Sequence, residues 1–277
     1  MVDNHLADVV SNSWGLPERF ASKGEIHALD MVFEQAQAQG MGIFFASGDD
    51  GDNVSATGHV SAGFPDSSPL VTSVGGTSLA IGSAGQRLWE TGWGTTELSW
   101  TGTSWGGTFP GSFLYGAGGG ASQVYARPSY QDGVVEGPMR SEPDVSLAAD
   151  PQTGVLFTQT YSKPDGGTEQ KESWIGGTSL SAPLMAGIAT LADQASGHPH
   201  GFLNPALYQL YGSPVFNDIT PSGGSLAVLR HRLRPDGTVA TLLRSLDRDS
   251  SLATSVGWDD VTGLGTPRAD LLIDALR

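Results

Sequence analysis

Short apolar runs alternate with amphipathic stretches along this chain, in the order expected of an α/β fold. Residues 7–15 form a β-rich apolar segment, and residues 42–46 form a continuous apolar run typical of a strand buried on both faces of a parallel sheet. Between them, apolar residues recur at helical intervals over 26–36, after Ser22 and Glu25 at the spacing of a capping box. The pattern predicts a buried strand, a surface helix packed on a sheet, and a second buried strand.

Later segments continue this pattern. Residues 70–77 predict another buried strand, and residues 154–161 predict a strand that ends in a glycine-rich turn. Residues 203–212 predict a short helix ended by glycine, whereas residues 221–254 show no strong period and are expected to be a surface excursion. Together these elements predict one α/β domain that spans residues 1–277.

The segment 173–194 combines a glycine-rich turn with the start of a small-residue helix. Two glycines and a threonine precede Ser179, and Pro183 is expected in the first helical turn, where no N–H is needed. The N–H groups and the positive end of the helix dipole favour negative charge beside the Ser179 hydroxyl, which suits a nucleophile. From a Gly-Thr-Ser alone, an ordinary helix cap is the favoured interpretation, because Ser and Thr are common N-cap residues.

Acidic side chains follow the second predicted strand. Asp49, Asp50, Asp52 and Asn53 stand at its carboxyl end, where open α/β sheets place their binding residues. Two other interpretations stay open, a solvated Asp-rich turn and a calcium loop. The second lacks the twelve-residue spacing with a closing Glu.

Oxygen donors also gather near the C-terminus, at residues 217–220 and 255–267. The two segments supply carboxylates and backbone carbonyls next to glycine, which is a ligand set suited to calcium. From the residues alone, an ordinary turn is the simpler interpretation.

Composition narrows the choice of partners. The 29 acidic and 14 basic side chains give a net charge of −15, which argues against nucleic acid and anionic membranes. Such a composition fits a protein that stays soluble in acid or binds cations. An ordinary acidic surface without either property explains it equally well. No apolar run is long enough to span a membrane, no signal peptide is recognisable, and cysteine is absent.

Four motifs in order resemble the sedolisin family, the serine-carboxyl peptidases. They are Ser-Trp-Gly at 13–15, Ser-Gly-Asp at 47–49, Gly-Thr-Ser-x-x-Ala-Pro at 177–183, and the Gly-Trp-Asp segment at 257–265. The resemblance covers nearly the whole chain, and the combination is specific although each motif alone is common. It implies an α/β subtilisin-like fold of three layers with a mainly parallel central sheet, and a secreted endopeptidase that acts on polypeptides in acid.

The resemblance also implies roles for individual residues. Ser179 corresponds to the nucleophile, and Asp49 corresponds to the acid that donates a hydrogen bond to the tetrahedral oxyanion. That role requires a protonated carboxyl, which an acidic medium supplies. One calcium ion is implied, with the ligands Asp218, Ile219, Ser255, Gly257 and Asp259.

The base that the family uses is not recognisable in this chain. In the family it is a Glu with an Asp four residues on, in a helix before the strand that matches residues 9–14. Only eight residues precede Val9 and none is Glu, while Glu25 and Asp30 are five apart in a later helix. None of the six histidines lies in the His-Gly-Thr-His segment that a subtilisin base requires.

We therefore expect the C-terminal part of a sedolisin-like catalytic domain, incomplete at its N-terminal side. Alone it should be inactive or nearly so, because a serine without a base is a poor nucleophile. A preceding segment or propeptide is the expected partner. The alternative is a degenerate peptidase that serves as a calcium-stabilised, non-enzymatic binding module.

Overall fold

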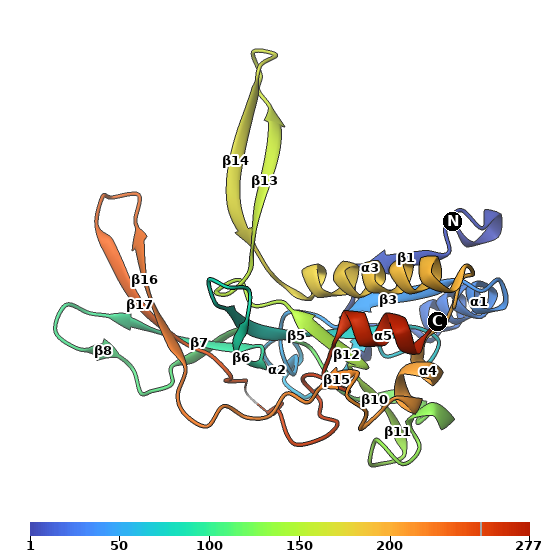
Figure 1. Cartoon of the computed structure of the whole chain (residues 1–277). Coiled ribbons are helices and arrows are strands. Elements are labelled where there is room, and N and C mark those ends of the chain that lie inside the picture. Colours follow the sequence, from blue (N-terminus) through green and yellow to red (C-terminus); the bar gives the residue numbers. More distant parts are fainter. Residues whose placement is uncertain (250) are drawn as a thin grey trace.

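A five-stranded sheet forms the centre of the structure (Figure 1). Its parallel strands are, in spatial order, β1 (Val9–Asn12), β3 (Gly42–Ala46), β5 (Thr72–Ile81) and β12 (Val145–Ala148), and β6 (Arg87–Gly92) pairs with β5 in antiparallel orientation. The computed structural model describes residues 1–249 and 251–277. The predicted α/β class with a mainly parallel central sheet is confirmed.

Two long helices cover opposite faces of this sheet. Helix α1 (Lys23–Ala38) packs on one face and α3 (Thr178–Ser196) on the other. Successive side chains of a strand point to opposite faces, so Phe44 joins the core beneath α3, whereas Ile43 and Phe45 join the core beneath α1. The fold therefore has the three layers that were predicted.

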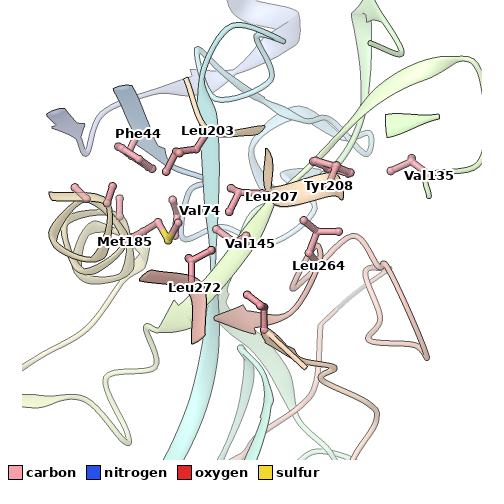
Figure 2. Close-up of a cluster of buried hydrophobic side chains, with 14 residues drawn as sticks. Phe44, Val74, Val135, Val145, Met185, Leu203, Leu207, Tyr208, Leu264 and Leu272 are labelled. Atoms are coloured by element: carbon pink, nitrogen blue, oxygen red, sulfur yellow. The ribbon is translucent and has the colours of Figure 1, made fainter. Parts of the chain in front are cut away.

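The larger core lies between the sheet and α3 (Figure 2). Phe44, Val74 and Val145 come from three neighbouring strands, and Met185 meets them from the helix. The remaining buried residues of α3 are mostly alanines, which lets the helix approach the sheet closely. The short helices α4 (Asn204–Gln209) and α5 (Ala269–Ala275) complete this layer.

A second sheet lies beside the first and is antiparallel. It consists of β16 (Ala227–Leu233), β17 (Val239–Ser245), β7 (Gly94–Trp100), β8 (Trp105–Gly106) and β9 (Ser112–Gly116). The segment 221–254, expected to be a surface excursion, thus contains a hairpin that extends a sheet. Because β16 is exposed along nearly its whole length, its sequence carries no burial period.

The remaining elements are short or peripheral. They are η1 (Val2–Asn4), β2 (Leu16–Pro17), η2 (Glu18–Phe20), α2 (Val54–Thr57), β4 (Gly63–Phe64), β10 (Gly120–Ala126), η3 (Ser129–Gln131), β11 (Met139–Glu142), β13 (Val155–Ser162), β14 (Thr168–Ile175), β15 (Phe216–Asn217) and β18 (Thr266–Pro267). The β13–β14 hairpin extends away from the body of the molecule and leads into α3 (Figure 1). No helix in the described ranges is long and apolar enough to cross a lipid bilayer.

Two local predictions need correction. Strand β1 is only half-buried, because it pairs with β3 on one side and with no other strand in the described part of the chain. Helix α3 begins at Thr178, so Pro183 is its sixth residue and lies in the second turn. Pro183 therefore lacks an N–H that would have bonded the Ser179 carbonyl.

Candidate active site

A cavity of about 300 Å³ opens at the carboxyl edge of the parallel sheet. The loop 13–17, which follows β1, and the loop 47–51, which follows β3, form much of its lining. The first two residues of α3, Thr178 and Ser179, line the cavity from the helix side. Parallel strands end at the same edge, so two predicted motifs distant in sequence meet beside the predicted nucleophile.

Ser179 is exposed at the N-terminus of α3, as predicted. The preceding Gly177 has a φ of +91°, a conformation that other residues rarely adopt. A Cβ on Gly177 would lie 2.7 Å from Asp49 Oδ2. Glycine at this position therefore permits both the turn into the helix and the close approach of Asp49.

Thr178 fixes the carboxyl of Asp49 beside Ser179. The Thr178 N–H donates to Asp49 Oδ1 at 2.8 Å. Thr178 Oγ1 lies 2.9 Å from the same oxygen and 3.1 Å from Gly48 O, so its single proton has two acceptors, and it accepts from the Gly48 N–H at 3.1 Å. The sequence had suggested no role for Thr178 beyond that of a helix cap.

Three acidic side chains line the cavity: Asp49, Asp50 and Asp66. The described lining contains neither histidine nor glutamate. The Glu25 N–H donates to Ser22 Oγ and the Ser22 N–H donates to the Glu25 carboxylate, which confirms the predicted capping box at the start of α1. The Asp30 carboxylate accepts hydrogen bonds from the hydroxyls of Ser68 and Tyr125. Neither Glu25 nor Asp30 lines the cavity.

Asp66 was not recognised from the sequence. Its side chain is buried, and burial raises its pKa to about 6. The adjoining carboxyl belongs to Glu142, whose pKa lies well above its ordinary value because of burial and because Asp66 is close. Glu142 accepts from the Gly63 N–H at 2.7 Å and from Ser73 Oγ at 3.1 Å. The sequence shows only an acid among Ser and Pro residues a few positions before the predicted strand 70–77.

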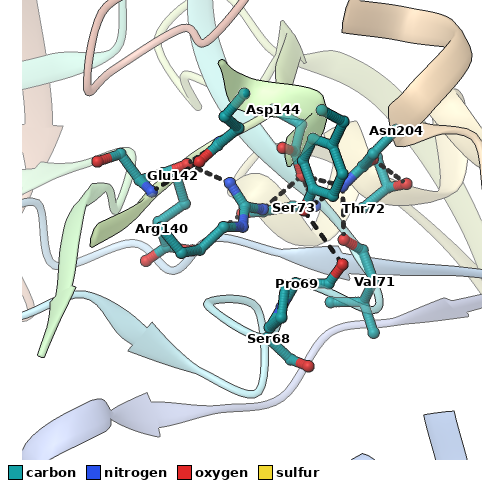
Figure 3. A network of polar contacts seen from close by, with 12 residues as sticks. Ser68, Pro69, Val71, Thr72, Ser73, Arg140, Glu142, Asp144 and Asn204 are labelled. Carbon is teal, nitrogen blue, oxygen red and sulfur yellow. Dashed lines mark hydrogen bonds and ion pairs between the residues drawn. The ribbon is translucent and has the colours of Figure 1, made fainter. Parts of the chain in front are cut away.

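A buried polar network surrounds Arg140 and Asp144 (Figure 3). Arg140 and Asp144 are fully buried and form an ion pair at 2.7 Å. Asp144 also accepts from the Ser73 N–H, from Asn204 Nδ2 and from the Tyr208 hydroxyl at 2.8, 3.1 and 3.0 Å. Burial raises the pKa of Asp144, although Arg140 and these donors act in the opposite direction. The network ties β5 and the start of β12 to α4.

The five predicted calcium ligands lie in two loops that contact each other. The Gly257 N–H donates to both carboxylate oxygens of Asp218, at 3.2 and 3.1 Å. The Ser255 N–H donates to Asp259 Oδ2 at 3.1 Å, and Ile219 is buried. Hard oxygen donors suited to calcium are therefore grouped here, but amide N–H groups occupy both carboxylates. Among the described residues, no group of three or more Asp, Glu, His or Cys side chains could hold a metal ion.

Comparison with known proteins gives consistent results. A model of the subtilase family matches residues 1–209. Kumamolisin from Bacillus sp. (strain MN-32) is 34% identical over 281 residues, which is 98% of this chain and 43% of that protein. Tripeptidyl-peptidase 1 from Canis lupus familiaris is 32% identical over 286 residues, 99% of this chain and 44% of that protein. The chain thus spans less than half the length of these relatives.

A solved structure resembles the whole chain. It is a Pseudomonas sedolisin, a serine-carboxyl proteinase in complex with two molecules of pseudo-iodotyrostatin. The two structures superpose with a TM-score of 0.74 at 27% identity, over 100% of this chain and 67% of the other.

Proposed function

Because the chain belongs to the subtilase family, in its sedolisin-like branch with a subtilisin-like fold, we propose that it forms part of a serine endopeptidase that cleaves polypeptides through Ser179. The observation that carries the proposal is the cavity at the sheet edge. It holds an exposed serine at a helix N-terminus together with a carboxyl fixed by Thr178. These are a nucleophile and an electrophilic group in one concave site.

In this reaction, Ser179 Oγ attacks the carbonyl carbon of the scissile peptide bond. The carbonyl oxygen becomes an oxyanion, and the serine proton passes through a base to the leaving amine. The acyl-enzyme on Ser179 is then hydrolysed by water. The dipole of α3, whose N-terminus lies at Ser179, favours the negative charge of the intermediate.

Asp49 donates the hydrogen bond that stabilises this oxyanion. The carboxyl must be protonated to donate, so activity depends on an acidic medium. The Thr178 N–H and Oγ1 are both oriented to Asp49 Oδ1 and hold the carboxyl in one direction. A prepositioned donor lowers the barrier more than a mobile one, because it needs no reorganisation during the reaction.

We expect the base to come from a segment outside these 277 residues. The acidic residues of the described lining are Asp49, Asp50 and Asp66, and none has a hydrogen bond to Ser179 in the described part of the chain. The partner segment must therefore bring a carboxylate to the Ser179 hydroxyl. In its absence, we expect the chain to have little or no peptidase activity.

An acidic site of action fits the electrostatics of the fold. Burial raises the pKa values of Asp66, Glu142, Asp144 and Asp150. Groups of this kind stabilise the folded chain in acid and lose that contribution as the pH rises. The net charge of −15 also means that the chain has many more carboxylates than basic side chains.

One calcium ion would be held by the carboxylates of Asp218 and Asp259 with the backbone carbonyls of Ile219, Ser255 and Gly257. The ion would join the loops that the Gly257–Asp218 hydrogen bonds already connect. We expect calcium at a hundredfold excess over its Kd to add about 2.7 kcal/mol to the free energy of unfolding. The variant Asp218→Asn should lose this increment, and Asp165→Asn, in the exposed β13–β14 turn, should keep it. Equal gains in both variants would contradict the calcium site.

Labelling with a fluorophosphonate, which reacts with activated serines, tests the proposed reaction. The chain extended by its own upstream coding sequence is compared with the 277-residue chain and with Ser179→Ala in the extended form. We expect labelling of the extended form alone. If the folded extended form is not labelled, or if Ser179→Ala is labelled equally, the peptidase proposal is wrong.

The absence of a histidine or glutamate from the described cavity lining favours one second candidate. In that case the chain is a calcium-stabilised binding module that keeps the peptide cleft without catalysis. It predicts peptide binding that survives Ser179→Ala and an upstream sequence without a Glu-x-x-x-Asp pair.

A further inference from the structure

The β16–β17 hairpin is basic, although the chain as a whole is acidic. Residues 227–248 contain five arginines and two aspartates, whereas the whole chain has a net charge of −15. The hairpin projects from the body of the molecule, and none of its residues lines the cavity beside Ser179 (Figure 1). The peptidase mechanism described above leaves this positive region unused.

A second cavity, of about 480 Å³, lies on this hairpin. Its most buried lining residues are Ala240 and Leu242 of β17, each 8% exposed. Arg232 stands opposite Ala240 in the strand register, so the two side chains lie on one face of the sheet. Arg234, which follows β16 in the turn, also lines the cavity. Two guanidinium groups therefore border an apolar floor.

The two arginines of this cavity have no carboxylate bound to them in the described ranges. The acid that lines the cavity, Glu97, already forms an ion pair at 2.9 Å with an arginine of β17. Asp236 lies in the same turn as Arg234, but its carboxylate accepts from the N–H and the hydroxyl of Thr238 at 2.9 and 2.7 Å. Arg232 and Arg234 are both exposed. Their guanidinium groups are thus available to an anionic ligand.

The sheet that carries this hairpin continues to the loop of Asp49. Strand β16 pairs with β17, β17 with β7, and β7 with β9. At the end of β9, the Gly116 N–H donates to the Asp49 carbonyl at 2.9 Å, and the Gly51 N–H donates to the Gly116 carbonyl at 3.1 Å. Neighbouring strands lie about 4.8 Å apart, so three strand spacings separate β16 from β9 by about 14 Å. An extended polypeptide of about five residues spans that distance.

We propose that the cavity on the β16–β17 hairpin binds an acidic segment of the polypeptide substrate, away from the place where the peptide bond is cleaved. Arg232 and Arg234 pair with aspartate or glutamate side chains, because a planar guanidinium binds a carboxylate through two hydrogen bonds. Ala240 and Leu242 contact an apolar side chain of the same segment. The role in substrate binding rests on the proposed peptidase function, whereas the binding of an acidic peptide does not.

Size and charge favour a peptide over a nucleic acid. A cavity of about 480 Å³ accepts only a few side chains. The chain has a net charge of −15, so a long polyanion that extends beyond the hairpin meets like charge. A short acidic segment is attracted by the arginines and avoids that repulsion.

Fluorescence anisotropy on the 277-residue chain tests the proposal with a labelled peptide of alternating glutamate and leucine. The matched probe has glutamine in place of glutamate. We expect the glutamate peptide to bind at least about tenfold more tightly, and Arg232→Met combined with Arg234→Met to remove about tenfold of that affinity. Lys23→Met combined with Arg277→Met, which removes two exposed cations elsewhere, should change it by about twofold or less. Equal binding of the two peptides, or equal losses in the two double variants, would overturn the proposal.

Two further measurements distinguish the alternatives. A single-stranded DNA oligonucleotide with the same net charge as the glutamate peptide should bind more weakly than that peptide; equal or tighter binding would overturn the assignment to a peptide. In the active extended form, the variant that lacks both cavity arginines should raise KM more for a substrate with an acidic segment about five residues from the cleaved bond than for the same substrate with glutamines there. An equal change for the two substrates overturns the role in substrate binding alone. Binding of the acidic peptide without Ser179-dependent cleavage overturns the peptidase function alone.

Discussion

Asp49 and Asp66 line one cavity, yet their surroundings differ in every respect that matters to a carboxyl. Asp49 is exposed and accepts from the N–H of Thr178, with the Thr178 hydroxyl also in reach. Asp66 is buried, bonds to another carboxyl, and has a pKa raised to about 6 by its burial. One cavity thus contains an exposed acid beside the proposed nucleophile and a buried acid whose pKa is raised.

The difference teaches that residue type alone does not assign a role in this cavity. The backbone around Asp49 supplies donors, because a helix starts beside it. The carboxyl of Asp66 is buried with Gly63 packed against it, and no amide, hydroxyl or cationic group in the described ranges donates to its Oδ2 atom.

The largest effect is expected at Asp49. In the active extended form, Asp49→Ala should lower kcat/KM by about 10²–10³, the usual effect of removing one oxyanion donor. Asp49→Asn keeps an oxygen for the Thr178 N–H and offers an N–H to the oxyanion, so it should lose less activity and depend less on acid. Steady-state kinetics against pH measures both. Equal losses in the two variants would show that Asp49 does not act as a donor.

A comparison of Asp144 with Asp66 separates the effect of burial from the effect of lacking a cationic partner. It is as buried as Asp66, but it is paired with Arg140. Arg140→Met leaves its charge uncompensated, and we expect the free energy of unfolding in urea to fall by about 3–5 kcal/mol. Lys171→Met, which breaks a pair at the surface with Glu169, should cost at most about 1 kcal/mol. A similar loss of unfolding free energy in the two variants would contradict a larger contribution from the buried pair.

A smaller effect is expected from the pH dependence of stability. A carboxyl whose pKa is higher in the folded chain stabilises the fold below its unfolded pKa, and this contribution is lost as the pH rises through the folded value. For Asp66 the two values are 3.8 and about 6. The free energy of unfolding should therefore fall between about pH 4 and pH 7, by about 1–3 kcal/mol from this group. In Asp66→Asn the fall should be smaller by that amount; an unchanged slope would contradict the assigned shift.

Much of the fold could be predicted because its local signals agree with its tertiary contacts. The capping box at Ser22 and Glu25 forms as expected, and the apolar run 42–46 is the central strand β3. Ser179 lies at the start of a helix, as its small neighbours indicated. Such features depend on residues near one another in the sequence, where periodicity and turn chemistry are informative.

The parts that were missed depend on distant contacts. Asp66 is buried against Glu142, 76 positions along the chain, and nothing near either residue marks the pairing. The β16–β17 hairpin was not predicted because β16 is exposed along nearly its whole length, and an exposed strand needs no alternation of polar and apolar residues. Thr178 gained its role only when β3 brought Asp49 beside the helix. The predicted calcium ligands stay a prediction.

The most direct test of the central claim is cleavage of a denatured protein, in acid with calcium, by the purified 277-residue chain beside its Ser179→Ala variant. We predict no cleavage by either, with circular dichroism showing that both are folded, because Ser179 and Asp49 lack their base. Cleavage by the chain that disappears in Ser179→Ala would contradict the account, since it would place a base within these residues.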